Sequence, residues 1–159
     1  MKSLSISIRS VFERGEGFTL IEVIVVTAIF ALLGSLGLFI GMDVYRSYSF
    51  RSERDIVVSM LEKARSQSMV NLDQSAHGVR IESARYTIFE GASYAGRIAA
   101  LDEAVDRAPT VLVAGNPPLP LDIVFGQLDG NVQNAGAVTI SDGARSELIT
   151  INHEGRIDW

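Results

Sequence analysis

The sequence contains no cysteine among its 159 residues, so no disulfide bond can hold the fold together. A domain built from this chain must rely on core packing or on assembly with other subunits. The chain also lacks a phosphate-cradling glycine loop and a serine in a nucleophile-elbow pattern. Its two histidines, His77 and His153, fall in predicted turns, where we expect them to be solvated. These absences predict a protein without catalytic residues, metal site or cofactor.

An excess of positive charge is also missing. The net charge is −5, whereas a general nucleic-acid binder needs a surface that neutralises phosphates. Four arginines can still form a local patch: Arg80, Arg85, Arg97 and Arg107. The carboxy terminus offers only Arg156 beside Asp158. We therefore expect no nucleic-acid partner, with DNA binding through the arginine patch as an alternative.

Three acidic residues, Asp102, Glu103 and Asp106, can meet around a helical turn. Carboxylate oxygens are ligands for calcium, but nothing around these residues resembles a defined calcium loop. We expect a solvated acidic face.

One long stretch nearly lacks charge, since Glu22 is its only charged residue between Phe18 and Met42. As a helix, this run spans roughly 37 Å, enough to cross about 30 Å of bilayer hydrocarbon. A buried helix of a soluble protein is one alternative, but residues 23–26 and 28–33 leave no polar face. A signal peptide is another, but the run is longer than such signals and no clear cleavage site follows it. The run therefore predicts a transmembrane helix.

Charged residues of both signs precede this run. Lys2, Arg9 and Arg14 precede it, together with two glutamates. The positive-inside rule then predicts a cytoplasmic amino end and a single crossing of the membrane. Everything after about Met42 is expected to be extracytoplasmic.

Glu22 needs an explanation, because a carboxylate inside hydrocarbon costs several kcal/mol unless it is paired or protonated. The apolar run contains no cation that can pair with it. One candidate partner is a new α-amino group, made by cutting the chain between Gly17 and Phe18, in the same helix or in a neighbouring one. The alternative is that Glu22 lies at the level of the lipid headgroups, where its carboxylate stays hydrated.

The start of the apolar run reads Gly17-Phe18-Thr19-Leu20-Ile21-Glu22, which resembles the prepilin motif of type IV pilins and type II secretion pseudopilins. The resemblance implies that a prepilin peptidase cuts after Gly17 on the cytoplasmic face and that Phe18 is then N-methylated. It also implies that Glu22 pairs with the terminal amine of a neighbouring subunit during assembly. Glu16 departs from the more basic leader that is common in this family.

The resemblance implies a structural subunit, not an enzyme, of a type II secretion pseudopilus or a type IV pilus. Its partners would be other pilin or pseudopilin subunits, the prepilin peptidase and the inner-membrane assembly platform. The subunit would reside in the inner membrane before it enters a filament. The lack of cysteine, and so of the disulfide loop of many major type IV pilins, favours the pseudopilus. Two alternatives remain: a DNA- or ligand-binding minor pilin, and a membrane-anchored domain of unrelated function.

No helix breaker follows Met42 until residues 71–73, so we expect one helix from Phe18 to about Val70. Its second half carries one narrow apolar or small face, formed by Val57, Met60, Leu61, Ala64 and Ser68. Its apolar half contains Gly34, Gly37 and Gly41, each of which costs about 1 kcal/mol relative to alanine. Gly37 and Gly41 fit a close-packing GxxxG pattern, although such a match is common by chance in an apolar segment. Local melting near Gly34–Gly41 within a filament is a related hypothesis.

After the helix, the spacing of apolar residues changes to the alternation that is typical of β-strands. We expect strands at residues 78–81, 84–89, 121–125, 137–140 and 147–151, and a closing hairpin over residues 152–159. Residues 97–105 are expected to form a short helical turn, and residues 116–120 a loop. Residues 121–158 also resemble minor pseudopilin H, more loosely.

One helix followed by strands predicts an α+β fold of pilin-like type, with an antiparallel sheet packed on the helix. The expected organisation is a leader over residues 1–17, a membrane and assembly helix over 18–42 and an extracytoplasmic domain over 43–159.

Overall fold

The computed structural model describes residues 17–159, apart from the side chains of residues 38–41 and 43. The chain separates into two compact units, Met1–Gly41 and Met42–Trp159. Of the predicted leader, only Gly17 lies within the described residues. The predicted boundaries of leader, membrane helix and domain stay predictions.

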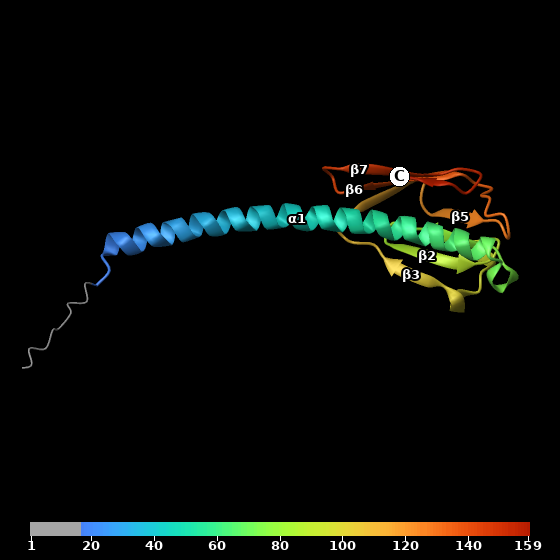
Figure 1. Cartoon of the computed structure of the whole chain (residues 1–159), viewed down its shortest axis with the longest axis horizontal. Helices are drawn as coiled ribbons and strands as arrows, with labels where there is room; N and C mark the ends of the chain where they lie inside the picture. The colour runs from blue at the N-terminus through green and yellow to red at the C-terminus, as the bar shows by residue number, and fades with distance from the viewer. Residues whose placement is uncertain (1–16) are drawn as a thin grey trace, which may run out of the picture. The chain divides into compact units, whose positions relative to one another are not determined.

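Helix α1 runs from Leu20 to Met69, close to the predicted bounds (Figure 1). It begins two residues later than predicted because Thr19 acts as its N-cap and accepts a hydrogen bond from the Glu22 N–H at 3.3 Å. Beyond its carboxyl end, Asn71 adopts a left-handed backbone with φ of 56°. Asparagine tolerates this conformation well, which explains why the helix ends where the sequence indicated. A short 3₁₀ turn, η1 (Leu72–Gln74), follows.

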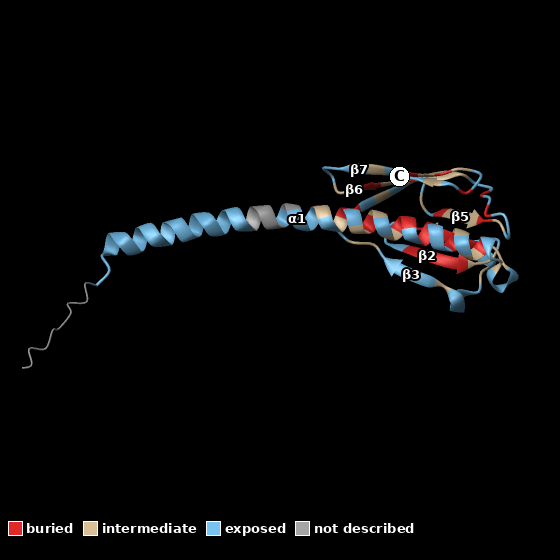
Figure 2. Cartoon of the chain, in the orientation of Figure 1, coloured by how far each residue is buried: buried red, intermediate tan, exposed pale blue. Residues whose placement is uncertain are grey.

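Within the second unit, α1 buries the face that the spacing predicted. Figure 2 shows this face in red where the helix passes along the strands. The buried positions include all five predicted residues, Val57, Met60, Leu61, Ala64 and Ser68, together with Phe50, Glu53 and Val58. The helical period of three and four residues was therefore sufficient to identify the side of α1 that faces the core.

The strands form two four-stranded antiparallel sheets instead of the single sheet that was expected. The first has the order β3-β2-β1-β5, with β3 at Glu103–Asp106, β2 at Arg85–Glu90, β1 at His77–Ile81 and β5 at Leu121–Phe125. The second has the order β4-β6-β7-β8, with β4 at Leu112–Asn116, β6 at Gly136–Ser141, β7 at Ser146–Ile151 and β8 at Ile157–Asp158. The α+β class is confirmed, but the division into two sheets depends on long-range pairing that periodicity does not reveal.

Two strands, β3 and β4, were not predicted. Residues 97–105 do not form one helical turn. They contain a 3₁₀ turn, η3 (Ala99–Leu101), then Asp102 and the start of β3, and another 3₁₀ turn, η2 (Tyr94–Gly96), precedes them. All four residues of β3 are exposed, so no apolar alternation marks it, and only its pairing with β2 makes it a strand. Strand β4 extends to Asn116, so the predicted loop over residues 116–120 is shortened by one residue.

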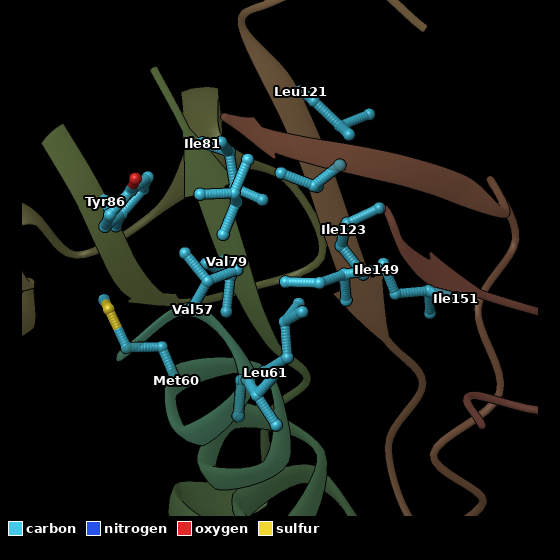
Figure 3. Close-up of a cluster of buried hydrophobic side chains, with 14 of the residues drawn as sticks. Val57, Met60, Leu61, Val79, Ile81, Tyr86, Leu121, Ile123, Ile149 and Ile151 are labelled. Atoms are coloured by element: carbon cyan, nitrogen blue, oxygen red, sulfur yellow. The ribbon is translucent and has the colours of Figure 1, made fainter. Parts of the chain in front are cut away.

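The helix and both sheets share one core. Figure 3 shows side chains from α1, such as Val57 and Leu61, against side chains from β1, β5 and β7. The core residues from the strands include Val79, Ile81, Tyr86, Leu121, Ile123, Phe125, Val138, Ile140, Ile149 and Ile151. Because apolar burial is the main favourable term in folding, this core explains how the second unit holds together without a disulfide.

Two buried polar groups on α1 attach the helix to the strands. Glu53 is 2% exposed; it accepts a hydrogen bond from the Tyr86 hydroxyl at 2.7 Å and another from the Ala108 N–H at 3.2 Å. Burial, and then the hydrogen bond to Glu53, raises the pKa of Tyr86 far above its usual value. Ser68 accepts from the His77 N–H at 2.7 Å and donates to the Phe125 carbonyl at 3.0 Å. Ser68 therefore joins the last turn of α1 to both β1 and β5.

Gly78 permits a close approach to β1 by its neighbours in the first sheet. A Cβ atom there would lie 2.6 Å from Phe89 Cζ and 2.8 Å from the Ile123 carbonyl oxygen. Both distances are shorter than van der Waals contact, so any side chain at this position would displace the Phe89 ring and force the backbone of β5 away from β1.

Candidate assembly site

Thr19 fixes where the amino end of α1 lies, and with it the position of Glu22. The Glu22 N–H donates to Thr19 Oγ1, and the Val23 N–H donates to the Thr19 carbonyl at 3.2 Å. A threonine followed three residues later by glutamate is the pattern of a capping box. Sequence reasoning missed this role of Thr19, although the spacing between Thr19 and Glu22 was sufficient to find it.

Glu22 lies exposed in the first turn of α1. The helix dipole favours a negative charge at this end, because the first N–H groups of a helix have no partners within it. No cation among residues 17–159 forms an ion pair with Glu22. Within the described residues, the carboxylate is therefore available to a partner outside this chain.

Gly17 and Phe18 precede the helix in non-helical backbone. Phe18 is 82% exposed, and a side chain at Gly17 would meet nothing within 4 Å. The peptide bond between them is therefore accessible. The predicted cleavage residues and Glu22 lie together at one end of α1.

The segment Leu20–Gly37 is long and apolar enough to cross a membrane, and none of it is buried within the protein. Its hydroxyl groups are satisfied inside the helix: Thr27 donates to the Val23 carbonyl at 2.9 Å and Ser35 to the Leu32 carbonyl at 2.8 Å. Such internal pairing removes the cost of placing these hydroxyls in hydrocarbon.

Gly34 and Gly37 have open space where a side chain would be, with nothing within 4 Å. The described part of the chain therefore gives no internal packing reason for these glycines. Close packing with another helix, or local melting, stays a prediction. The side chain position of Gly41 lies outside the described residues.

The two histidines differ, and the prediction for one of them was wrong. His77 is buried as the first residue of β1, because the strand begins one residue earlier than expected. His153 is exposed in the turn before β8, with Nδ1 3.1 Å from the Val132 carbonyl oxygen.

The acidic residues considered for calcium do not converge on one point. Each pairs with a different cation: Asp102 with Arg97 at 2.7 Å, Glu103 with Lys63 at 2.5 Å, and Asp106 with Arg85 at 2.7 Å. These separate ion pairs argue against a shared calcium ion at this position.

The arginines of the possible basic patch are each bound to an acceptor. Arg80 contacts Glu82 and Asp122, and its hydrogen bond to Glu82 raises its pKa. Arg107 donates to the Ser83 carbonyl, while Arg85 and Arg97 form the ion pairs just given. Arg80 and Arg97 also lie over the ring of Tyr94, at 4.2 and 3.6 Å from its centroid. Three of the four arginines, Arg80, Arg85 and Arg97, are thus paired with carboxylates, which weakens the case for phosphate binding.

Comparison with known proteins gives two matches of different kinds. A family model described as the prokaryotic N-terminal methylation motif matches residues 14–38. The crystal structure of the type IV minor pilin FimU of Pseudomonas aeruginosa (strain PAO1) is similar, with a TM-score of 0.57 and 21% sequence identity, and the match covers 70% of this chain and 88% of that chain. A search of curated proteins gave no significant match.

Each match contributes a separate part of the assignment. The family model covers Gly17, Phe18 and Glu22, while the likeness to FimU, at 21% identity, shows the fold alone. The looser resemblance to minor pseudopilin H stays a prediction. The methylation motif and the pilin-like fold together support the assignment of this chain to the type IV pilin and pseudopilin family, as a pilin-type subunit.

Proposed function

We propose that this chain is a structural subunit of a type II secretion pseudopilus or a type IV pilus, cut after Gly17 and N-methylated at Phe18. The observation that supports this most strongly is the arrangement at the amino end of α1. The methylation motif coincides there with an accessible Gly17–Phe18 bond and with an apolar helix that the protein itself does not bury.

Glu22 is proposed to guide assembly. In a membrane, an unpaired carboxylate penalises an isolated subunit and favours one that is docked beside a partner. Cleavage before Phe18 would create an ammonium group, and that group on a neighbouring, staggered subunit can supply the missing cation. The absence of an ion pair to Glu22 among residues 17–159 supports this role.

The proposed topology places the amino end in the cytoplasm, one span in the inner membrane and the domain after about Met42 on the extracytoplasmic side. The prepilin peptidase and the inner-membrane assembly platform are the proposed partners before the subunit enters the filament.

Mass spectrometry of the amino terminus of membrane-extracted protein from the native cell tests the processing step. We expect the chain to begin at methylated Phe18, and we expect Gly17→Ala to retain the leader. A matched substitution away from the motif, His153→Gln, should be processed normally. An intact Met1 terminus in a cell that contains the peptidase would contradict the proposal and leave a membrane-anchored domain of unrelated function.

Glu22→Gln separates assembly from processing. It keeps the size and the hydrogen-bonding groups of the side chain but removes the charge, so the leader should still be cut while incorporation into sheared filaments falls at least tenfold. Unchanged incorporation would exclude the pairing role of Glu22.

A strain that lacks the gene for this chain distinguishes the type II secretion pseudopilus from the type IV pilus. Loss of type II secretion with normal surface pili would support the pseudopilus, and loss of pili with normal secretion would support the pilus. Loss of neither, with processing intact, would contradict the filament role.

A further inference from the structure

Three potential metal ligands come together where the chain leaves α1 and enters the first sheet. Asp73 lies in η1, His77 is the first residue of β1, and Glu90 is the last residue of β2, directly opposite His77 in the strand register. Each residue offers one ligand atom, and these atoms all lie within 4.8 Å of one another.

The imidazole of His77 is held in place but is not fully satisfied. His77 is 4% exposed, and its backbone N–H donates a hydrogen bond to Ser68 Oγ at 2.7 Å. Its Nδ1 atom is buried and has no hydrogen-bond partner. Buried polar atoms almost always have a partner, because a buried one without a partner destabilises the fold. This orphaned nitrogen points to a ligand.

The two carboxylates beside His77 also lack a cation. Among the described residues, neither Asp73 nor Glu90 forms an ion pair, whereas Glu82 and Asp122, at and beyond the other end of β1, are bound by Arg80. Two carboxylates and a buried imidazole therefore face one another without a neutralising positive charge.

We propose that Asp73, His77 and Glu90 bind one divalent transition-metal ion, with zinc as the best match. An imidazole nitrogen with two carboxylate oxygens suits zinc, whereas calcium and magnesium prefer oxygen ligands alone. The two carboxylates balance the charge of the ion, and water completes a four-coordinate site.

The distances are compatible with this ion after a small side-chain movement. Ligand atoms around a tetrahedral zinc are separated by roughly 3.4 Å, given metal–ligand distances of about 2.1 Å. Asp73 is exposed and Glu90 is half-buried, so their side chains can rotate towards the fixed ring of His77.

The ion would tie η1 to both β1 and β2. Since the chain has no cysteine, it would stabilise this junction in the way that a disulfide does in other exported domains. The sequence alone predicted no metal here, because His77 was placed in a solvated turn and Glu90 lies far from Asp73 along the chain.

Zinc binding to the full-length, tag-free chain in detergent micelles tests the proposal. After removal of metals with EDTA, the protein is titrated with zinc chloride by calorimetry, and bound metal is measured by mass spectrometry after desalting. We expect one zinc per chain, a higher melting temperature with zinc, and no displacement by equimolar calcium. Asp73→Asn and Glu90→Gln preserve side-chain shape, and each should weaken zinc binding more than tenfold. His153→Gln changes the other histidine and is the control; it should bind zinc as the unaltered chain does.

Circular dichroism establishes that each variant is folded. Folded, unaltered protein that takes up no zinc would overturn the proposal, as would undiminished binding by both carboxylate variants. Because His77 is buried, His77→Gln is informative only if it folds, and the two carboxylate variants are sufficient without it. None of these measurements depends on leader processing, so the outcome is separate from that of the filament proposal.

Discussion

The two units of this chain use apolar side chains in opposite ways, although both draw on helix α1. From residue 17 to residue 37, every residue is exposed. In the second unit, α1 and two sheets bury their apolar side chains in one core. The exposed apolar side chains of the first unit are therefore available to a membrane or to other subunits, as the proposed function requires, whereas the second unit is stabilised by its own packing.

Two glutamates of α1, one in each unit, differ in burial and in the partners of their carboxylates. Glu53 is buried, and its carboxylate receives hydrogen bonds from Tyr86 and Ala108. Glu22 is exposed and has no ion-pair partner among the described residues. The carboxylate of Glu53 therefore helps to hold the second unit together, while that of Glu22 makes no such contact within the described residues.

The largest expected effect on stability is that of truncating a buried leucine of the second unit. Truncating an exposed leucine of the first unit serves as its control. Leu61 is fully buried, so Leu61→Ala should lower the free energy of unfolding of the domain by about 2–5 kcal/mol. Leu33 is 56% exposed, so Leu33→Ala should leave the domain unchanged within ~0.5 kcal/mol. Thermal and urea unfolding of the full-length chain in micelles measure both. Equal losses for the two variants would contradict the division of roles between the units.

A smaller effect is expected from removing one hydroxyl group. Tyr86→Phe keeps the ring in the core but deletes the donor to Glu53, which should cost about 1–3 kcal/mol. Tyr48→Phe serves as the control, because Tyr48 is 73% exposed on the same helix. A cost for Tyr86→Phe no greater than that of the control would show that Glu53 does not depend on this hydrogen bond.

The smallest effect is expected at the amino end of α1. Thr19→Ala removes the acceptor for the Glu22 N–H, a change worth about 1 kcal/mol at an N-cap. The backbone amide of Glu22 should then exchange with solvent about fivefold faster, as measured by NMR in micelles. Thr19→Ser retains the hydroxyl and should keep the slower exchange, and unfolding of the domain should be the same in both variants. Slow exchange in Thr19→Ala would exclude the capping role.

Much of the helix was predictable because its signals are local. The uncharged run of residues 23–42, the spacing of Val57, Leu61 and Ala64, and the turn residues at 71–73 lie within a few residues of the features that they specify. The strands with apolar alternation, such as β5, were found for the same reason. Strand β3 was missed because all of its residues are exposed and only its pairing with β2 defines it.

The candidate assembly site was predictable from one short segment. Gly17, Phe18 and Glu22 stand within six residues, so no tertiary contact is needed to bring them together. The proposed metal site is different, since Asp73 and Glu90 become neighbours only when β1 pairs with β2. Sequence reasoning had no local pattern from which to join them.

The sequence by itself determined the long helix, the side of it that faces the core, the class of the fold and the motif at its start, because each depends on residues that are close along the chain. The tertiary structure alone decided the division into two sheets, the burial of His77, the partners of Glu53 and the separation of Asp102, Glu103 and Asp106 among three cations. The physical reason is that strand pairing and side-chain contacts join residues that are distant in sequence, and their energies depend on what the folded chain brings within reach.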